Sequence, residues 1–341
     1  MLLQLPTADL DLIAERVGPR WQALRGQRLL LTGGTGFIGK WLLGSFLHAN
    51  RSLGLDAKVV VLSRDVAGFK AKHPELTEAG EIEWLQGDVR DFELAAPCPF
   101  AIHAATDVVA TAAASTIFDT CARGTSNVLA HVQDGGRALL LSSGAVYGRT
   151  PSTLERIPED YVGAPDPLLT SSAYGEGKRA SELLCAMAAA ERGISAPVAR
   201  CFAFVGAHLS LDKHFAIGNF IGAAMSDKPL TISGDGTPLR SYLDAADLAR
   251  WLWVLLFEGQ SARAYNVGGD EALSIEQLAH RVTAALGSKS EVQVAQQAKL
   301  GAPIQKYLPD LHRAEQELGL RCEIGLDEAI RRTARWHQEH S

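Results

Sequence analysis

The chain has 341 residues, of which 47% are apolar and 21% charged, and its formal net charge is −6. This composition is close to that of an ordinary soluble globular protein, and it excludes a disordered chain or a coiled coil. The negative charge gives no electrostatic basis for binding nucleic acid. The longest apolar run, residues 183–190, is much shorter than the ~20 residues of a membrane span, and the first residues lack a secretion signal. We therefore expect a cytoplasmic protein with no nucleic-acid or membrane partner.

The length predicts two compact units, at ~150 residues per domain. Before the first apolar strand, Leu10, Ile13 and Val17 follow helical spacing, so we expect a short amphipathic helix in an N-terminal extension, residues 1–27. Helical patterns then alternate with six apolar strands, expected at residues 28–32, 58–63, 82–86, 100–105, 138–142 and 196–202. This alternation is typical of an α/β fold, a Rossmann doubly wound parallel sheet with helices on both faces.

The pattern changes after about residue 204, where short strands lie between loops rich in Gly and Asp. We expect residues 28–204 to form a cofactor-binding domain and residues 205–341 a smaller α/β lobe that binds substrate and is interleaved with the first domain. Five cysteines are widely spaced, without a Cys-x-x-Cys pair. An odd, scattered set is neither a disulfide framework nor a metal site, so we predict no metal.

A glycine-rich loop follows the first expected strand. Its first glycine permits a tight turn, the second lets the backbone approach a pyrophosphate, and the third lets helix and strand pack closely. The N-terminus of the following helix offers unpaired N–H groups and the positive end of its dipole to the phosphates. The dinucleotide-binding residues predicted in this segment are Gly33, Thr35, Gly36, Phe37, Ile38 and Gly39.

The end of the second strand bears on the choice of dinucleotide. NAD sites usually place an acid there for the ribose 2′-hydroxyl, whereas this chain has Ser63 and Arg64, with no acid before Asp65. We therefore favour NADP(H) over NAD. Two alternatives stay open: Arg64 can be a solvated surface cation with no role in binding, and the Asp65 side chain can turn toward the ribose. Asp88 is placed to meet the adenine amino group, with a plain turn residue as the alternative. Further cofactor contacts are predicted at Val89, Ala104, Ala105 and Thr106.

Tyr174 and Lys178 stand four residues apart in a helical pattern and therefore share one face. A phenol with a pKa of ~10 is a poor base at neutral pH, but a nearby ammonium and an oxidised nicotinamide both favour the phenolate. Tyr174 can then serve as a general acid and base, and both residues are also expected to contact the cofactor. Ser143 ends the fifth strand, at the edge where such sheets bind ligands, and can donate a hydrogen bond to a substrate oxygen.

With these motifs together, the chain resembles the extended short-chain dehydrogenase/reductase family, which includes nucleotide-sugar epimerases and dehydratases. The matching segments are Thr32-Gly-Gly-Thr-Gly-Phe-Ile-Gly39, Gly87-Asp88, His103-Ala-Ala105, Gly124-Thr125, Ser142-Ser-Gly-Ala-Val-Tyr-Gly148, Tyr174 with Lys178, residues 200–207 and residues 234–248. The resemblance implies that Ser143, Tyr174 and Lys178 form the catalytic triad. It also implies a C-terminal lobe for a nucleotide-sugar, and often a homodimer built on a helix bundle.

The resemblance leaves the reaction open. Dehydratase relatives carry an Asp-Glu pair before the Val-Tyr-Gly segment and decarboxylase relatives carry a Glu, whereas this chain has Gly144 and Ala145. This disfavours a dehydratase or decarboxylase and leaves an NAD(P)-dependent epimerase or a 4-ketoreductase. The NADP-like strand end favours the reductase, whereas the Ser-Gly-Ala segment resembles the epimerases.

Three residues are expected to contact the substrate: Tyr147, Asn219 and Arg240, the last because an arginine fork suits a diphosphate. Four positions depart from the family pattern. Many relatives have Asn where this chain has Cys121 and Ala203, and Ser172 and Gly177 stand where the Tyr174 motif usually has Pro and Ser. The change at Ala203 keeps open a reductase of a non-sugar carbonyl. A non-catalytic cofactor-binding sensor is a further alternative, which the complete triad disfavours.

Overall fold

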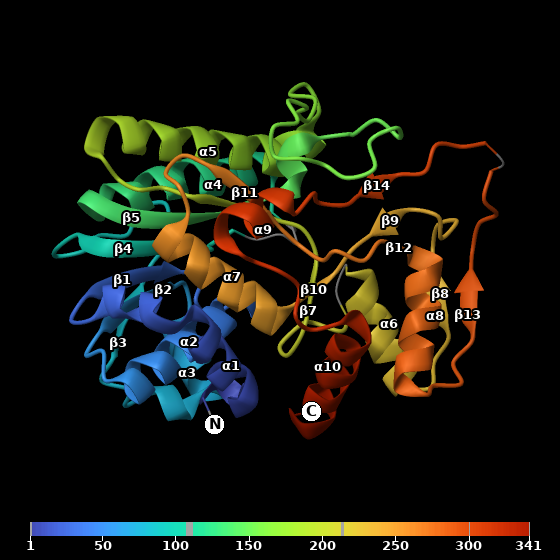
Figure 1. The fold of residues 1–341 in the computed structure, drawn as a ribbon, viewed down its shortest axis with the longest axis horizontal. Helices are drawn as coiled ribbons and strands as arrows, with labels where there is room; N and C mark the ends of the chain where they lie inside the picture. Colours follow the sequence, from blue (N-terminus) through green and yellow to red (C-terminus); the bar gives the residue numbers. More distant parts are fainter. Residues whose placement is uncertain (1, 107–111, 213–214, 300, 341) are drawn as a thin grey trace. The chain divides into compact units, whose positions relative to one another are not determined.

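The computed structural model describes residues 2–106, 112–212, 215–299 and 301–340 (Figure 1). The chain divides into two compact units, and each is assembled from separate segments rather than from one contiguous range. Unit 1 comprises residues 1–148, 162–201 and 249–265, and unit 2 comprises residues 149–161, 202–248 and 266–341. The N-terminal extension is thus part of unit 1.

Unit 1 is built on a seven-stranded sheet with the order β11-β6-β5-β4-β1-β2-β3. The strands are β1 (Arg28–Thr32), β2 (Lys58–Ser63), β3 (Ile82–Gln86), β4 (Cys98–His103), β5 (Val132–Ser143), β6 (Val198–Cys201) and β11 (Ala264–Val267). Every neighbouring pair from β3 to β6 is parallel. The strand order reverses between β1 and β4, which is the doubly wound arrangement, so the predicted Rossmann-type α/β fold is confirmed.

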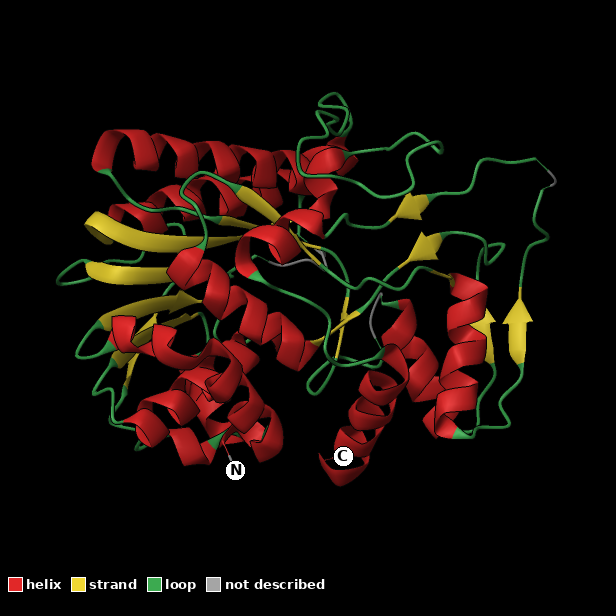
Figure 2. Cartoon of the chain, in the orientation of Figure 1, coloured by secondary structure: helices red, strands yellow, loops and turns green. Residues whose placement is uncertain are grey.

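Helices cover both faces of this sheet (Figure 2). The helices α4 (Ala114–Ala130) and α5 (Ala173–Arg192) pack together on one face, while α1 (Thr7–Val17) and α2 (Phe37–Leu53) lie on the other. The helix α1 is the short amphipathic helix expected in the N-terminal extension. Because both faces are covered, the β1 residues Leu29–Leu31 are fully buried, as expected for a central parallel strand.

A cluster of aromatic rings ties the N-terminal extension to the rest of unit 1. Trp21 lies in the 3-10 helix Gly18–Leu24, and its ring centroid is 4.6 Å from that of Trp253 on α7 (Ala245–Glu258). The Trp253 indole donates a hydrogen bond of 2.8 Å to the Ser45 hydroxyl on α2. Both rings are buried, so residues 1–27 contribute to the core of unit 1.

Three strands have boundaries that differ from those expected. The strand β4 is Cys98–His103 instead of 100–105, β5 is Val132–Ser143 instead of 138–142, and β6 is Val198–Cys201 instead of 196–202. Cys98 pairs with Val132, and the register then shifts before Phe100. Gly135, with φ of +73°, allows the backbone to continue through this irregularity, where the sequence reads as a turn.

Unit 2 contains short strands and four helices that lie wholly within it among the described residues, as expected of a smaller α/β lobe. The strands are β7 (Phe204–Val205), β8 (Leu230–Ile232), β9 (Leu239–Arg240), β10 (Leu243–Asp244), β12 (Leu273–Ser274), β13 (Val292–Val294) and β14 (Lys306–Tyr307). The helices are α6 (Ala216–Met225), α8 (Ile275–Leu286), α9 (His312–Leu318) and α10 (Leu326–His340). A reciprocal capping box between Ser274 and Gln277 begins α8.

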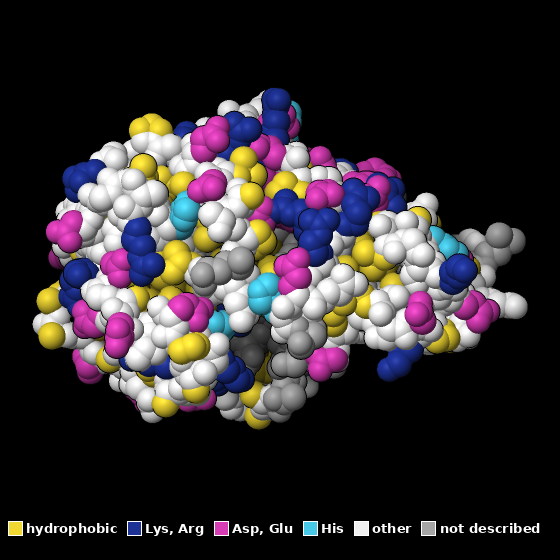
Figure 3. All heavy atoms as spheres, turned by 90° about the horizontal axis from the view of Figure 1, so that it is seen from below, with side chains coloured by type: hydrophobic (Ala, Val, Ile, Leu, Met, Phe, Trp, Pro, Cys, Tyr) yellow, Lys and Arg dark blue, Asp and Glu magenta, His cyan; other side chains and the backbone are white. Residues whose placement is uncertain are grey.

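All five cysteines are free thiols, and four of them are buried. On the face drawn in Figure 3, acidic and basic side chains are interspersed, so neither sign of charge dominates it. No helix within residues 2–106, 112–212, 215–299 and 301–340 is long and apolar enough to cross a membrane.

Asp244 is a buried carboxyl group in unit 2. Its Oδ1 accepts a hydrogen bond of 2.7 Å from the Ala246 N–H, and the Asp247 and Glu328 carboxylates exert like-charge repulsion on it. Burial raises the pKa of Asp244 to about 7 from its ordinary 3.8, and the like charges add to this effect. The folded state therefore binds a proton at Asp244 that the unfolded state has already released.

Between about pH 4 and about pH 7, only the folded state binds a proton at Asp244. The free energy of unfolding therefore falls as pH rises through this range. Replacing Asp244→Asn should remove that dependence, so the variant should gain on the order of 4 kcal/mol relative to wild type between pH 4 and pH 8. Urea unfolding at several pH values measures the difference. The exposed Asp227→Asn is the control and should follow wild type, and equal pH dependence in all three proteins would contradict the assignment.

Candidate active site

The glycine-rich loop lies between β1 and α2, at the point where the strand order reverses. Gly33 has φ of +73°, and a Cβ atom there would approach the Ala104 carbonyl group to 2.6 Å. A Cβ atom at Gly39 would overlap the Gly33 carbonyl oxygen. Gly36 precedes α2, so backbone N–H groups at the helix N-terminus stay accessible to a phosphate. The loop therefore fits the phosphates of a dinucleotide.

A pocket of about 250 Å³ opens beside this loop in unit 1. Ten of the predicted cofactor-binding residues line it: Gly33, Thr35, Gly36, Ser63, Arg64, Asp88, Val89, Ala104, Ala105 and Thr106. Phe37, Ile38, Gly39, Tyr174 and Lys178 are not among the lining residues. The lining residues that were not predicted are Leu62, Gly87, Arg90, Ala112, Thr116, Ile117 and Thr120.

The end of β2 presents a cation to this pocket rather than an acid. The Asp65 carboxylate accepts a hydrogen bond of 2.8 Å from the Gly68 N–H and caps the N-terminus of α3 (Val66–Lys72). Arg64 lines the pocket, and its charge helps to lower the pKa of Asp88. The Asp65 carboxylate is therefore engaged as the N-cap of α3, a common role for an Asp just before a helix.

Lys178 is the central group of the predicted triad. Its side chain is 2% exposed, and its ammonium donates hydrogen bonds of 2.7 Å to the Leu141 carbonyl and 2.9 Å to the Thr106 hydroxyl. The Lys178 nitrogen lies 6.0 Å from the centroid of the Tyr174 ring. Desolvation lowers the pKa of Lys178, and the neighbouring buried Cys121 opposes that shift. The arrangement provides a fixed positive charge beside a half-buried phenol.

Ser143 ends β5 and begins the 3-10 helix Gly144–Tyr147. Its hydroxyl oxygen accepts a hydrogen bond of 3.2 Å from the Ala145 N–H, and its own proton can still be donated. The packing of α5 keeps this strand end close to the tyrosine, since a Cβ atom on Gly175 would lie 2.8 Å from the Ala145 carbonyl oxygen. All three predicted catalytic residues thus lie in one region of unit 1.

A partly buried ion pair supports the same strand end. The Ser142 hydroxyl donates a hydrogen bond of 2.6 Å to the Glu182 carboxylate, which also accepts two hydrogen bonds, of 3.0 Å and 2.7 Å, from Arg200. The Arg200 guanidinium lies 4.8 Å from the centroid of the Tyr147 ring. Sequence reasoning missed this network because its members are far apart along the chain.

The two other predicted substrate contacts lie in unit 2. Arg240 ends β9, donates a hydrogen bond of 2.8 Å to the Leu239 carbonyl, and lies over the Tyr307 ring at 5.5 Å. Asn219 is exposed within the first turn of α6, whose N-cap position is occupied by Phe215. Asn219 therefore does not cap this helix.

Comparison with known proteins gives a consistent picture. The sequence profile described as "NAD dependent epimerase/dehydratase family" matches residues 29–268. UDP-glucuronic acid decarboxylase 3 from Arabidopsis thaliana is 28% identical over 313 residues, which is 89% of this chain and 86% of that protein. A dTDP-glucose 4,6-dehydratase from Streptomyces niveus is 24% identical over 324 residues, covering 92% of this chain and 93% of its own length.

Solved structures with a similar fold are also nucleotide-sugar enzymes. A dTDP-glucose 4,6-dehydratase from Streptomyces venezuelae, with NAD and DAU bound, has a TM-score of 0.76 and 26% identity. The match covers 92% of this chain and 97% of the other. A UDP-glucuronic acid 4-epimerase mutant from Bacillus cereus has the same TM-score at 21% identity, covering 92% of this chain and 100% of that one, a likeness of fold.

The Glu182–Arg200 pair generates a stability prediction. The two side chains are 16% and 15% exposed, so Glu182→Met leaves a largely desolvated guanidinium without its counter-charge. We expect a loss of about 3 kcal/mol in the free energy of unfolding, most of which the double variant Glu182→Met with Arg200→Met should recover. Urea unfolding measures both values.

The exposed pair Arg28–Glu83, also in unit 1, provides the matched control. Its variant Glu83→Met should cost less than about 1 kcal/mol. Equal costs for the two single variants would show that the Glu182–Arg200 pair is not desolvated in solution.

Proposed function

Because the chain belongs to the NAD dependent epimerase/dehydratase family, we propose that it is a nucleotide-sugar epimerase or 4-ketoreductase that uses NAD(P) for hydride transfer at a sugar carbon. The chain is an enzyme of the extended short-chain dehydrogenase type. The observation that carries the proposed reaction is the Lys178 ammonium, buried beside the Tyr174 ring and below the strand end that bears Ser143.

The proposed chemistry assigns one role to each of these residues. Tyr174 takes the proton of the sugar hydroxyl that is oxidised and returns a proton when the carbonyl is reduced. Lys178 favours the phenolate of Tyr174 by its charge, and Ser143 donates a hydrogen bond to the same sugar oxygen. When bound, the nicotinamide of NAD(P) supplies the hydride acceptor and donor. Arg240 is proposed to bind the diphosphate and Asn219 and Tyr147 to contact the sugar nucleotide.

A second candidate function is favoured by the names of the relatives, several of which are UDP-glucuronic acid decarboxylases and one a dTDP-glucose dehydratase. Both reactions would need an acid–base group beside the strand end, where this chain has Gly144 and Ala145. The carboxylate that does reach this region, Glu182, already accepts hydrogen bonds from Arg200 and Ser142. These residues support a reaction in which the sugar loses neither carbon dioxide nor water.

For the cofactor, we propose NADP(H). The support is that Arg64 lines the pocket while Asp65 is used as the cap of α3, so that a 2′-phosphate would meet a cation. The solved relatives contain NAD, which keeps NAD as the alternative. For assembly, we propose a homodimer, since Phe118 on α4 and Leu183 and Met187 on α5 are exposed apolar side chains of two helices packed together.

The first prediction concerns Tyr174. Wild-type protein should either epimerise a nucleotide-sugar, with UDP-glucuronic acid and dTDP-glucose tested first, to a product of unchanged mass, or use NADPH to reduce a 4-keto nucleotide-sugar to a product heavier by two hydrogen atoms. Replacing Tyr174→Phe should lower kcat by about 100-fold or more because the proton acceptor is lost, while NADPH binding is retained. Mass spectrometry of the product and fluorescence titration measure the two effects. The variant Tyr265→Phe, which changes a buried phenol in β11, is the control and should stay active.

Two outcomes would contradict this assignment. Full activity of the Tyr174→Phe variant would remove the role given to the phenol. Release of carbon dioxide from UDP-glucuronic acid, or loss of water from dTDP-glucose, would establish the second candidate function instead.

Native mass spectrometry of the purified protein tests the cofactor and the assembly together. We expect a dimer whose cofactor site is empty and takes up NADPH in preference to NADH. Tightly retained NAD would favour an epimerase and contradict the NADP(H) proposal, and a monomer at micromolar concentration would contradict the homodimer.

A further inference from the structure

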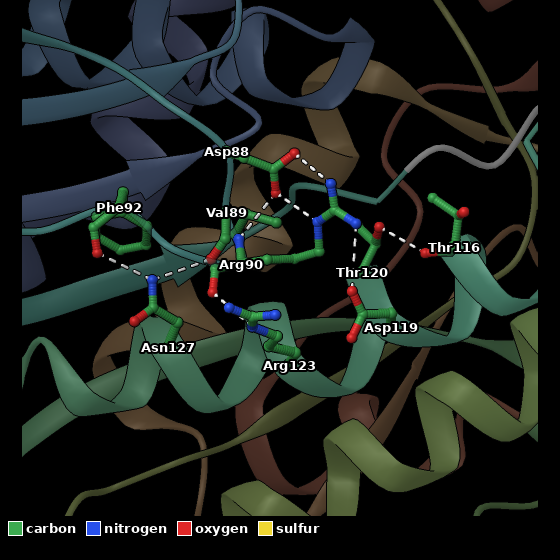
Figure 4. Close-up of polar contacts among 9 residues, drawn as sticks. All are labelled: Asp88, Val89, Arg90, Phe92, Thr116, Asp119, Thr120, Arg123 and Asn127. Carbon is green, nitrogen blue, oxygen red and sulfur yellow. Dashed lines mark hydrogen bonds and ion pairs between the residues drawn. The ribbon is translucent and has the colours of Figure 1, made fainter.

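The loop after β3 forms one wall of the cofactor pocket and is organised around Arg90 (Figure 4). The Arg90 Nε donates a hydrogen bond of 2.8 Å to Asp88 Oδ1, and its Nη2 donates one of 2.9 Å to Asp88 Oδ2. The Arg90 backbone N–H donates a third hydrogen bond, of 3.0 Å, to Asp88 Oδ1. The remaining arm, Nη1, reaches Asp119 on α4 at 3.2 Å. One guanidinium thus fixes both oxygens of Asp88 and joins them to a neighbouring helix.

A row of polar side chains on α4 holds the same loop. Asp119, Arg123 and Asn127 are spaced four residues apart and share one face of the helix (Figure 4). Arg123 donates a hydrogen bond of 3.1 Å to the Arg90 carbonyl, and Asn127 donates to the carbonyls of Val89 and Phe92. Only the contact from Asp119 involves the Arg90 side chain, while Arg123 and Asn127 hold the backbone. The position of the loop and the orientation of Asp88 therefore depend on different residues.

The Asp88–Arg90 pair faces the pocket. Both residues line it, and their side chains are 30% and 32% exposed. A carboxylate can accept about four hydrogen bonds, and Asp88 Oδ2 accepts only one from Arg90. This oxygen keeps acceptor capacity for a donor in the pocket, and the bidentate fork restricts the rotation that would turn it away.

We propose that Arg90 is a positioning residue for Asp88 and thereby sets the preference of this pocket for an adenine over a hypoxanthine base. The inference rests on the proposed function, in which the pocket takes an adenine dinucleotide. Adenine presents an amino group at C6, which donates to a fixed carboxylate oxygen. Hypoxanthine presents a carbonyl oxygen at the same position, which such an oxygen repels.

The charge state of Asp88 agrees with this role. The hydrogen bonds from the Arg90 side chain are the largest cause that lowers the pKa of Asp88, and the charge of Arg64 contributes in the same direction. Asp88 is therefore an acceptor without a proton of its own at neutral pH, and a hypoxanthine carbonyl finds no donor on it.

The test compares Arg90→Met with Arg123→Met, which removes a guanidinium from the same loop and helix without touching Asp88. Each protein is titrated with NADPH, with NADH and with the hypoxanthine analogue of each. For each dinucleotide, the Kd of the hypoxanthine analogue is divided by the Kd of the adenine form, and this ratio measures the adenine preference. Wild type should prefer adenine by about tenfold or more, as expected for a hydrogen bond to a charged group. In Arg90→Met the ratio should fall to about threefold or less. In Arg123→Met both affinities should weaken together and leave the ratio unchanged.

The conservative variant Arg90→Lys separates orientation from charge. A lysine keeps the cation between Asp88 and Asp119 but lacks the planar fork, so its ratio should lie between those of wild type and Arg90→Met. Thermal unfolding shows whether each variant is folded at the temperature of the titration.

Retention of the adenine preference in both Arg90 variants would overturn the proposal, as would an equal loss in Arg123→Met. Failure of wild type to bind any of the four dinucleotides would instead refute the proposed cofactor, and the inference would fall with it. The two failures are distinguished by the wild-type titration alone.

Discussion

The buried ammonium of Lys178 needs hydrogen-bond acceptors in place of water, and the packing of several elements of unit 1 provides them. A charge at 2% exposure is stable only where hydrogen-bond acceptors replace water, and here the Leu141 carbonyl and the Thr106 hydroxyl do so. Reaching both acceptors requires α5 to approach the end of the sheet very closely. Gly175 allows this approach, since a Cβ atom there would meet the Ala145 carbonyl, and Gly177 allows α5 to pack closely on α4, since a Cβ atom there would meet the Cys121 side chain.

The same constraint explains two departures from the family pattern. Gly177 stands where relatives carry a larger residue, and Cys121 stands where many have Asn, yet the two positions contact one another across α4 and α5. Beside them, Thr125 donates a hydrogen bond of 2.9 Å to Ser181, which in turn donates to the Cys121 carbonyl. Small side chains with local hydrogen bonds thus replace larger ones at a close helix contact. The opposite side of α4 holds the Asp88–Phe92 loop, so one helix contacts both the loop that lines the pocket and the helix that carries Tyr174 and Lys178.

Local patterns in the sequence were sufficient for the parallel sheet, the glycine-rich loop, and the helix that carries Tyr174 and Lys178. They were sufficient because each depends on hydrophobic period, turn chemistry or spacing within a few residues. The N-cap role of Asp65 could also have been predicted from the sequence, since an Asp directly before a helix is a common N-cap. The Glu182–Arg200 pair and the contact from Asp119 to Arg90 were not, because the partners come from different elements. The early start of β5 was missed for a related reason, since its pairing with β4 extends a strand through Gly135 and Gly136.

The arrangement of charge at the end of β5 bears on which reaction the site can perform. Glu182 is bound by the Arg200 fork and by Ser142, so both of its carboxylate oxygens already accept hydrogen bonds within the protein. Gly144 and Ala145 contribute no titratable group, so the proposed function assigns proton transfer at this strand end to Tyr174 and hydrogen bonding to Ser143. With NAD(P) as the hydride acceptor and donor, one phenol beside a cation would supply the acid–base chemistry that interconverts an alcohol and a ketone, because a single proton moves in each direction. Elimination or decarboxylation would need a second acid–base group, and this physical difference is why the proposed function is an epimerase or ketoreductase despite the names of the relatives.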